Sequence, residues 1–432
     1  MWTNQASVLP ITMAHFMKTI FLCLLLSLFA AHSGLAQDEQ TYLKRGIGKA
    51  EKGDFDGAIS DFDKAIHVAP TSPDGFYNRG ITLQKKGDFD GALADLNKAI
   101  SLKSDYSLAF NARGLAKHSK GDIAGASADF NKAIALNPRF SEAYNNRGNM
   151  RQMMQDLTGA LADFEQAIRI DPKSADSYFN RGHARKAQGD LDGAITDFTM
   201  AITLDPKASD AYHNRGTTRQ MKGDLERALA DIDKAIELKP DASAYSSRAE
   251  VKRAKGDLTG AGADFNKSVE LDPTNPRTYR ARGYFHYRQQ RSAEALADFR
   301  KSNELNSSDD YVHFAIFLTR ARLGQTAAAA EELQKWLGTR RAQPNDWATK
   351  VGQFLAGQLA EPDFLKAASN PQKQVETGQK CEAFFYAGMK RLIAGDKPKA
   401  TEYFQNCLAT GQKDFTEYAS AEVELKSLKP AP

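Results

Sequence analysis

The chain has 432 residues, of which 41% are hydrophobic and 26% charged, with 58 Lys and Arg against 54 Asp and Glu. This composition is typical of a globular protein or a repeat solenoid and excludes an intrinsically disordered chain. The net charge of +4 is spread along the sequence without a basic cluster, so it provides no footprint for nucleic acid or anionic lipid.

The first 36 residues have the pattern of a cleaved secretory signal peptide. Lys18 precedes the apolar run Thr19–Ala31, and a small-residue stretch, Gly34–Gln37, follows it. This order is typical of secretory signals, and the run is shorter than the roughly 20 residues that a membrane-spanning helix needs. We therefore expect cleavage after Ala36, secretion across the inner membrane into the bacterial periplasm, and no integral membrane segment in the mature chain.

The chain then repeats itself every 34 residues, with one step of 33. Each repeat carries an Arg-Gly pair, or Arg-Ala in one case, and an alanine follows 12 residues after the second member. The pairs are Arg45-Gly46, Arg79-Gly80, Arg113-Gly114, Arg147-Gly148, Arg181-Gly182, Arg215-Gly216, Arg248-Ala249 and Arg282-Gly283. The missing residue falls between Lys239 and Tyr245, which predicts a loop there because loops tolerate deletions.

This pattern resembles the tetratricopeptide repeat (TPR) family, whose 34-residue repeat is a helix–turn–helix. When the glycine of each repeat is numbered position 8, the marker positions 4, 8, 20 and 27 of the second repeat are Phe76, Gly80, Ala92 and Ala99. The resemblance implies an all-α, right-handed superhelical solenoid with a C-terminal helical hairpin cap. Helices of about 14 residues are marginal alone in water, so neighbouring repeats must share a core.

The repeat phase predicts five segments. They are a signal peptide at 1–36, eight TPR units at 37–309, a ninth degenerate TPR at 310–340, short helices and a loop at 341–380, and a TPR-like hairpin with a capping helix at 381–432. In the fourth segment we expect helices at Pro344–Leu359 and Glu361–Ser369, and a loop at Asn370–Lys380. The tail resembles the C-terminus of bacterial envelope TPR proteins of the NlpI type, although those are lipoproteins and no lipobox is visible here.

An arginine stands at position 7 of all eight repeats, where the TPR family usually has leucine, and an aspartate stands at position 23. In an antiparallel hairpin these positions lie within one helical turn of equal height, so a charge-assisted pair can form within a repeat or with a neighbour. We interpret the pairs as a structural ladder rather than a ligand site. They include Arg79 and Asp95, Arg113 and Asp129, Arg147 and Asp163, Arg181 and Asp197, and Arg215 and Asp231.

Two cysteines, Cys381 and Cys407, lie beyond the predicted signal peptide. They occupy positions 1 and 27 of the C-terminal hairpin, which lie at equal height, and an oxidising periplasm permits a disulfide between them. We expect this disulfide, and a pair of buried free thiols is the alternative.

The sequence contains no H-E-x-x-H, C-x-x-C, G-x-S-x-G or G-x-x-x-x-G-K motif. The repeated acidic turns, such as Gly87–Gly91, lack the ligand pattern of calcium loops and are interpreted as helix–helix turns with an aspartate cap. No histidines have metal-ligand spacing, although His183 and His213 can face one groove from adjacent repeats. We therefore expect no enzyme activity, no cofactor and no metal site.

The remaining chemistry is recognition of another protein. The resemblance implies that positions 2, 5, 9, 12 and 13 of each first helix line a concave groove. Amide and aromatic side chains in the middle repeats suit an extended peptide, and basic and aromatic ones in the last regular repeats suit acidic groups. The candidate partner-binding residues are Tyr77, Asn111, Asn145, Asn149, Phe179, His183, Lys186, His213, Arg253, Arg277, Arg280, Tyr284 and Tyr287. A solvated surface is the alternative for any one of them.

These features predict a non-enzymatic scaffold or adaptor that binds protein or peptide partners in the groove. The NlpI-type resemblance implies envelope hydrolases or proteases as partners. One alternative is a structural assembly protein that self-associates into a homo-oligomer through its C-terminal hairpin. Another is an accessory subunit of an envelope secretion or polysaccharide-export complex.

Overall fold

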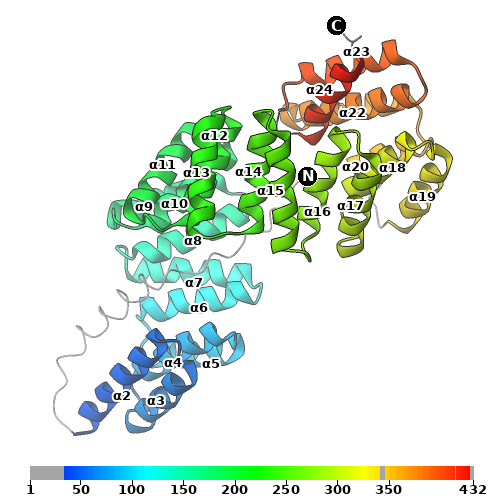
Figure 1. Cartoon of the computed structure of the whole chain (residues 1–432). Helices are drawn as coiled ribbons and strands as arrows, with labels where there is room; N and C mark the ends of the chain where they lie inside the picture. Colours follow the sequence, from blue (N-terminus) through cyan, green and yellow to red (C-terminus); the bar gives the residue numbers. More distant parts are fainter. Residues whose placement is uncertain (1–33, 341–345, 414, 429–432) are drawn as a thin grey trace. The chain divides into compact units, whose positions relative to one another are not determined.

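The computed structural model describes residues 34–340, 346–413 and 415–428, and the regular secondary structure in these ranges is helical, from α2 to α24 (Figure 1). The all-α architecture of consecutive helical hairpins that the repeat phase predicts is confirmed. Nearly all of the predicted signal peptide lies outside the described residues. Among the helices that are described, none combines the length and the apolar character needed to cross a membrane.

Sixteen helices form eight consecutive hairpins, one for each repeat. The pairs are α2 (Gly34–Glu51) and α3 (Phe55–Val68), α4 (Pro73–Lys86) and α5 (Phe89–Leu102), α6 (Ser107–Ser119) and α7 (Ile123–Leu136), α8 (Ser141–Met153) and α9 (Leu157–Ile170), α10 (Ala175–Gln188) and α11 (Leu191–Leu204), α12 (Ser209–Met221) and α13 (Leu225–Leu238), α14 (Ala242–Ala254) and α15 (Leu258–Leu271), and α16 (Pro276–Arg288) and α17 (Ser292–Leu305).

The turn inside a hairpin depends on a glycine followed by an aspartate. In the second hairpin, Gly87 ends α4 with a φ of 87°, a left-handed conformation that glycine adopts without strain. Asp88 then caps α5 by accepting a hydrogen bond from the backbone N–H of Gly91 at 2.9 Å. The acidic turns are therefore helix caps, which agrees with their interpretation from the sequence.

Close approach of the two helices depends on the glycine at position 8. A Cβ atom at Gly148 would lie 2.6 Å from the ring of Phe164, which is fully buried in the same hairpin. Gly114 and Phe130 show the same 2.6 Å approach. The hairpin thus closes by seating an aromatic ring at position 24 against a residue without a side chain.

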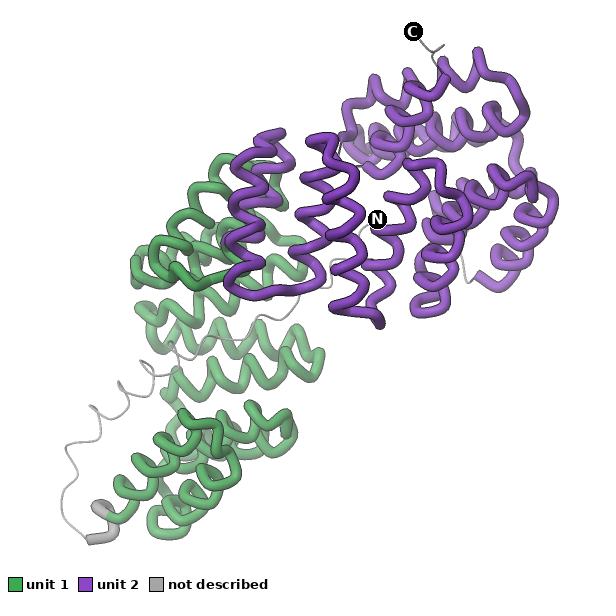
Figure 2. The backbone as a smooth tube through the Cα atoms, in the orientation of Figure 1, with its two compact units in different colours: residues 1–211 green, residues 212–432 purple. Residues whose placement is uncertain are grey.

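The chain divides into two compact units, residues 1–211 and residues 212–432, which we call the N-terminal and C-terminal units (Figure 2). The N-terminal unit has small cores shared between hairpins. One of them contains Tyr77, Leu96 and Ala99 of the second hairpin together with Tyr106 and Ala109 at the start of the third. This sharing is what stacked repeats require, because one hairpin cannot bury its apolar face alone.

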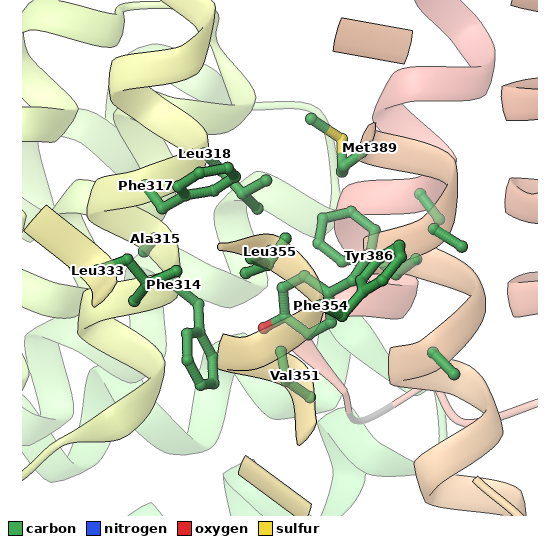
Figure 3. Packing of buried hydrophobic residues seen from close by; sticks show 14 of the residues in the cluster. Phe314, Ala315, Phe317, Leu318, Leu333, Val351, Phe354, Leu355, Tyr386 and Met389 are labelled. Atoms are coloured by element: carbon green, nitrogen blue, oxygen red, sulfur yellow. The ribbon is translucent and has the colours of Figure 1, made fainter. Parts of the chain in front are cut away.

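The C-terminal unit continues beyond α17 with seven helices and a large aromatic core. The helices are α18 (Asp310–Arg322), α19 (Thr326–Thr339), α20 (Trp347–Leu355), α21 (Glu361–Ala367), α22 (Lys373–Ile393), α23 (Lys397–Ala409) and α24 (Thr416–Leu428). Figure 3 shows Phe314 of α18, Phe354 of α20 and Tyr386 of α22 in this core. The rings of Phe354 and Phe364 stack with centroids 4.2 Å apart.

The predicted loop at Asn370–Lys380 is wrong, because α22 begins at Lys373 and runs for 21 residues. Its first turns are polar because most of their side chains are exposed or half-buried, while Gly378 is buried against the ring of Phe415. The buried side of these first turns is a glycine, not a row of large apolar residues. The sequence therefore lacks the apolar periodicity from which a helix is predicted. The helix expected at Pro344–Leu359 is also shorter, although its first residues lie outside the described ranges.

Candidate protein-interaction surface

Each arginine at position 7 binds the aspartate 16 residues later in its own hairpin. In the fifth repeat, Nε of Arg181 donates to Oδ2 of Asp197 at 2.9 Å and Nη2 donates to Oδ1 at 2.7 Å. The same bidentate geometry joins Arg45 to Asp61, Arg79 to Asp95, Arg113 to Asp129, Arg147 to Asp163, Arg215 to Asp231, Arg248 to Asp264 and Arg282 to Asp298. Such paired bonds from a planar guanidinium to a carboxylate are strong and geometrically specific.

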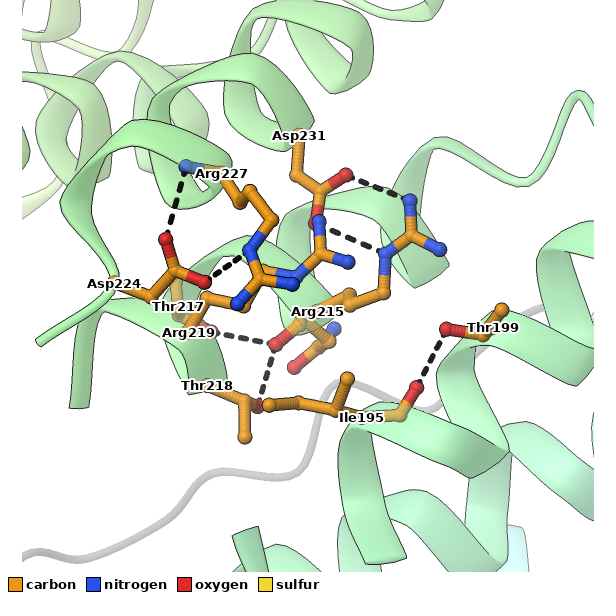
Figure 4. A network of polar contacts seen from close by, with 10 residues as sticks. Ile195, Thr199, Arg215, Thr217, Thr218, Arg219, Asp224, Arg227 and Asp231 are labelled. Atoms are coloured by element: carbon orange, nitrogen blue, oxygen red, sulfur yellow. Dashed lines mark hydrogen bonds and ion pairs between the residues drawn. The ribbon is translucent and has the colours of Figure 1, made fainter. Parts of the chain in front are cut away.

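A second cation at position 11, which the sequence interpretation missed, completes most of these pairs. In the sixth repeat, Nη1 of Arg219 lies 2.6 Å from Oδ2 of Asp231, so Arg215 and Arg219 both bind one carboxylate (Figure 4). The corresponding cations are Lys49, Lys117, Arg151, Arg185 and Lys252, with His286 more distant in the eighth repeat. Only Leu83 of the second repeat breaks the series, so the periodic basic residue was a readable signal.

The arginine at position 7 also contacts the preceding hairpin. Nη1 of Arg79 donates to Asp63 at 2.6 Å, and Nη1 of Arg147 donates to Asn131 at 2.7 Å. The sequence left open whether the arginine pairs within a repeat or with a neighbour, and in these repeats it does both. Each guanidinium further stacks on an aromatic ring at position 4, as Arg147 does on Tyr144 at 5.5 Å from the ring centroid.

Two aspartates of the ladder, Asp61 and Asp264, have lowered pKa values. Burial alone would raise the pKa of Asp264, but hydrogen bonds from Arg248 and Lys252 lower it below its usual value. The hydrogen bond from Arg45 likewise lowers the pKa of Asp61. The ladder arginines are thus engaged by buried carboxylates, which supports their interpretation as part of the structural frame.

The residues at positions 2, 5, 9, 12 and 13 of the first helices form a surface that we call the first-helix face. In the N-terminal unit, Asn111 and Asn145 are half-buried on this face. Each accepts a 3.0 Å hydrogen bond through Oδ1 from an asparagine of the next hairpin, Asn146 and Asn180 respectively. Asn149 is also half-buried, and its amide makes no hydrogen bond with the described part of the chain. The face therefore presents amide groups along α6 and α8.

Two aromatic candidates of the N-terminal unit belong to the core instead. Tyr77 is 5% exposed and packs on Tyr106, with ring centroids 5.0 Å apart. Phe179 is 8% exposed and packs against His183 and Phe198, at 4.6 and 5.7 Å. Tyr77 thus fills the gap toward the next hairpin, whereas the ring of Phe179 contacts residues of its own hairpin. Both rings are buried rather than placed on an accessible surface.

The remaining polar candidates are half-buried. His183 and Lys186 lie on α10, and His213 lies on α12 with its Nε2 2.8 Å from the hydroxyl of Ser247 on α14. That contact joins position 5 of one hairpin to position 6 of the next, as the asparagine pairs do. Among the described residues, the structure contains no group of three or more His, Cys, Asp or Glu side chains arranged to hold a metal ion.

The basic set of the C-terminal unit is largely neutralised by acids of the same chain. Nε of Arg253 donates to Glu250 at 2.7 Å, and Arg280 pairs with Asp309. Arg277 is the exposed member of the set. The prediction of a basic surface for acidic groups therefore did not account for Glu250 and Asp309, the acids of the same chain that bind Arg253 and Arg280.

Tyr284 and Tyr287 lie beneath the C-terminal helices. Tyr287 is 3% exposed, and its hydroxyl lies 4.0 Å from Sδ of Met389 on α22. Tyr284 lines a small cavity together with Tyr386 of α22 and Glu417 of α24. In this structure the predicted partner-binding tyrosines of the eighth repeat are covered by the chain itself.

Cys381 and Cys407 are brought together but are not bonded. Both thiols are buried and free, with their Sγ atoms 3.4 Å apart. The predicted partners are therefore adjacent across α22 and α23, whereas the predicted disulfide is absent from the structure and the free-thiol alternative is the one observed.

Models of repeat families match three stretches of the chain. A "TPR repeat" model matches residues 114–155 and 154–189, a "Tetratricopeptide repeat" model matches 73–106 and 175–208, and a second model of that description matches 213–276. No catalytic family is among these matches.

One curated relative is the "Lipoprotein NlpI homolog" of Haemophilus influenzae, which is 26% identical over 157 residues. The match covers 35% of this chain and 48% of the relative, so the chain spans about half of that protein's length.

Solved structures with a similar arrangement include a tetratricopeptide repeat protein from Parabacteroides merdae, at 23% identity, with 57% of this chain and 98% of that chain covered and a TM-score of 0.45. Another is YrrB, described as a TPR protein with an unusual peptide-binding site. It is 26% identical, the match covers 45% of this chain and 97% of YrrB, and the TM-score is 0.36.

Proposed function

Because the repeats of this chain are tetratricopeptide repeats, which imply a protein–protein interaction scaffold, we propose that it binds partner proteins along the first-helix face of α6 and α8. The repeats belong to a fold that is typically non-enzymatic, and the proposed activity is recognition. The partner segment is an extended peptide, whose backbone offers one donor and one acceptor per residue.

The amide row formed by Asn111, Asn145 and Asn149 carries this proposal. Asn111 and Asn145 use Oδ1 to accept from the following hairpin, so their own NH₂ groups can donate to carbonyl oxygens of a partner. Arg113 and Arg147 of the same hairpins bind buried carboxylates and so belong to the frame. The three amides form an uncharged, bidirectional hydrogen-bonding row beside Glu142 of α8, and such a row suits a peptide backbone.

We further propose that the mature chain works in the bacterial periplasm, with envelope proteins such as hydrolases or proteases as partners. The signal-like pattern of residues 1–36 supports export, and the lipoprotein description of the Haemophilus relative supports an envelope setting. Fractionation of cells that express the full chain tests this, and a cytosolic, uncleaved protein would contradict it.

A photo-reactive amino acid at Asn149 tests the binding surface. We expect it to form adducts with another protein in cells, whereas the same group at Arg169, an exposed residue on the second helix of the same hairpin, forms none. The double variant Asn111→Ala/Asn145→Ala should then weaken binding of the captured protein about tenfold. Equal capture from positions 149 and 169, or capture from 169 alone, contradicts the proposal.

A further inference from the structure

Helices α22 and α24 both contact the first-helix face of the eighth and ninth repeats. One small cavity is lined by Tyr284 and Tyr287 of α16, by Leu318 of α18, and by Glu417 and Ser420 of α24. Tyr284 and Tyr287 occupy positions 9 and 12 of the eighth repeat, and Leu318 occupies position 9 of the ninth. The equivalent positions of α6 and α8 are those that the proposed function assigns to a partner, and here side chains of the chain's own α22 and α24 line the cavity beside them.

Two glutamates of α24 meet residues of two successive repeats. Glu424 forms an ion pair with Arg322, which is position 13 of the ninth repeat. Glu417 lines the cavity together with Tyr284 and Tyr287 of the eighth repeat. Arg322 also stacks on Tyr287, with its guanidinium 3.9 Å from the ring centroid. One helix thus places two glutamates against side chains of two repeats that follow one another in sequence.

The spacing of the two carboxylates matches the spacing of packed helices. Glu417 and Glu424 are seven residues apart, so they share a face and are separated by about 10.5 Å along the helix axis. Packed helices generally lie about 8–10 Å apart. A helix with glutamates at i and i+7 can therefore contact two neighbouring helices at once.

The buried face of α24 is unusually polar for a helix that belongs to a core. Its buried residues are Glu417, Ser420, Ala421 and Glu424. Glu417 accepts a 3.0 Å hydrogen bond from the hydroxyl of Tyr386, while the half-buried Tyr418, Leu425 and Leu428 of the same helix pack against the aromatic core. An unmatched buried charge is costly, so a buried carboxylate discriminates against a binding surface that lacks a matching group.

We propose that α16 and α18 form a receptor for an amphipathic protein helix with carboxylates seven residues apart, which the chain fills with α24 until the helix of a partner replaces it. The proposal rests on the proposed function, because it assumes that the first-helix face binds proteins. It adds a second mode of recognition at this face: a charged helix at the C-terminal repeats, beside an extended peptide at the amide row.

Two variants of the full chain separate the receptor from its occupant. Glu424→Arg breaks the ion pair from the side of α24 and leaves the receptor intact. Arg322→Glu breaks the same ion pair from the side of the receptor. A fluorescent synthetic peptide of residues 413–428 serves as the probe, and hydrogen exchange reports whether α24 has lost protection.

We expect the peptide to bind Glu424→Arg about tenfold more tightly than it binds the unmodified chain, because the receptor is vacated. It should bind Arg322→Glu no better than the unmodified chain, and a peptide carrying Glu424→Arg should restore binding to that variant. Equal binding to the two variants overturns the proposal. So does unchanged protection of α24 in the double variant Glu417→Gln/Glu424→Gln, because the carboxylates then do not hold the helix.

This experiment and the capture at Asn149 fail independently. Loss of peptide binding with capture retained at 149 would remove the helix receptor and leave the amide surface intact. Peptide binding without capture at 149 would have the opposite meaning.

Discussion

The eight regular repeats and the C-terminal helices bury acidic side chains in opposite ways. In the repeats each buried aspartate is bound by a bidentate arginine, and in most of them by a second cation. In the C-terminal core Glu382 accepts hydrogen bonds from Tyr311 and Trp347 at 2.9 Å, and burial raises its pKa to about 8. Burial likewise raises the pKa of Glu417. The same hairpin architecture thus tolerates buried carboxylates either by pairing them or by protonating them.

The residues of the arginine–aspartate ladder are replaced step by step toward the C-terminus. The ninth repeat has Ile316 at position 7 but retains the pair of positions 11 and 23 as Arg320 and Glu332. In the last hairpin Arg391 and Tyr403 occupy those two positions, and both bind Glu361 of α21. A carboxylate thus still binds position 11 of this hairpin, but it comes from α21 instead of from position 23. A charged contact at this height is therefore a feature of the hairpin, and the acid can come from the hairpin itself or from another helix.

Removing the ring at position 24 should have the largest effect in either region. Phe164 and Phe404 are both fully buried against the glycine of their own hairpins. We expect Phe164→Ala and Phe404→Ala each to lower the local free energy of unfolding by about 3–5 kcal/mol. Because repeats contact only their neighbours, hydrogen exchange should rise in α8 and α9 for the first variant and in α22 to α24 for the second. Loss of protection throughout the chain in both would contradict this local behaviour.

Breaking one ladder pair should have the next largest effect. Arg181→Leu leaves the buried carboxylate of Asp197 with Arg185 alone, and we expect a loss of about 2–3 kcal/mol in unfolding free energy. The double variant Arg181→Leu/Asp197→Leu should recover part of that loss, since the uncompensated charge is gone. Chemical denaturation of both single variants and the double variant measures the coupling. Purely additive losses would show that the pair does not act as a unit.

The two regions should respond to pH in opposite directions. Glu382 keeps its proton up to about pH 8 in the folded chain, against 4.5 for an ordinary glutamate, so its contribution to stability is present at low pH and is lost as the pH rises from 4.5 through 8. The pKa of Asp264 is lowered below 3.8, so its contribution is present above that pH and is lost only as the pH falls further.

Urea unfolding followed by tryptophan fluorescence and by hydrogen exchange of α20–α24 tests this contrast. Raising the pH from about 5 to about 8.5 should lower the stability of these helices in the unmodified chain and much less in Glu382→Gln. The exchange of α14 and α15, which carry Arg248 and Asp264, serves as the internal control. An identical pH dependence with and without Glu382 would refute its role.

Completing the ladder should have the smallest effect. The second repeat has Leu83 at position 11, so Asp95 is held by Arg79 without the second cation of the other repeats. Leu83→Arg should stabilise the second hairpin by about 0.2–1 kcal/mol, with Leu83→Met as the uncharged control. The gain should shrink at high salt, because a partly exposed pair is screened. An equal gain from both substitutions would assign it to packing instead.

The periodic features of this protein could be predicted from the sequence because each is repeated. The hairpins, the aspartate caps and the pairing of Arg79 with Asp95 depend on distances of 3 to 16 residues within one repeat. The second cation was equally periodic and was missed because position 11 varies between lysine and arginine.

The remaining features depend on neighbours that the sequence does not mark. Tyr77 is buried by a ring from the next hairpin, and Arg322 meets Glu424 across roughly a hundred residues with no periodic signal. The first turns of α22 are polar and were interpreted as a loop, although Gly378 packs against Phe415. Burial at position 5 and coverage by α24 are tertiary properties, so candidate contacts chosen by position alone included core residues.

The central claim is that partners bind the amide row of α6 and α8, whereas the chain covers the equivalent face of the eighth repeat with its own helices. The most direct test places one photo-reactive group at Asn149 or at Tyr287 of the full chain and maps the crosslinked residues by mass spectrometry. We expect adducts with a second protein from position 149 and adducts within the chain, to α22 or α24, from position 287. Capture of a second protein from 287, with none from 149, would contradict it.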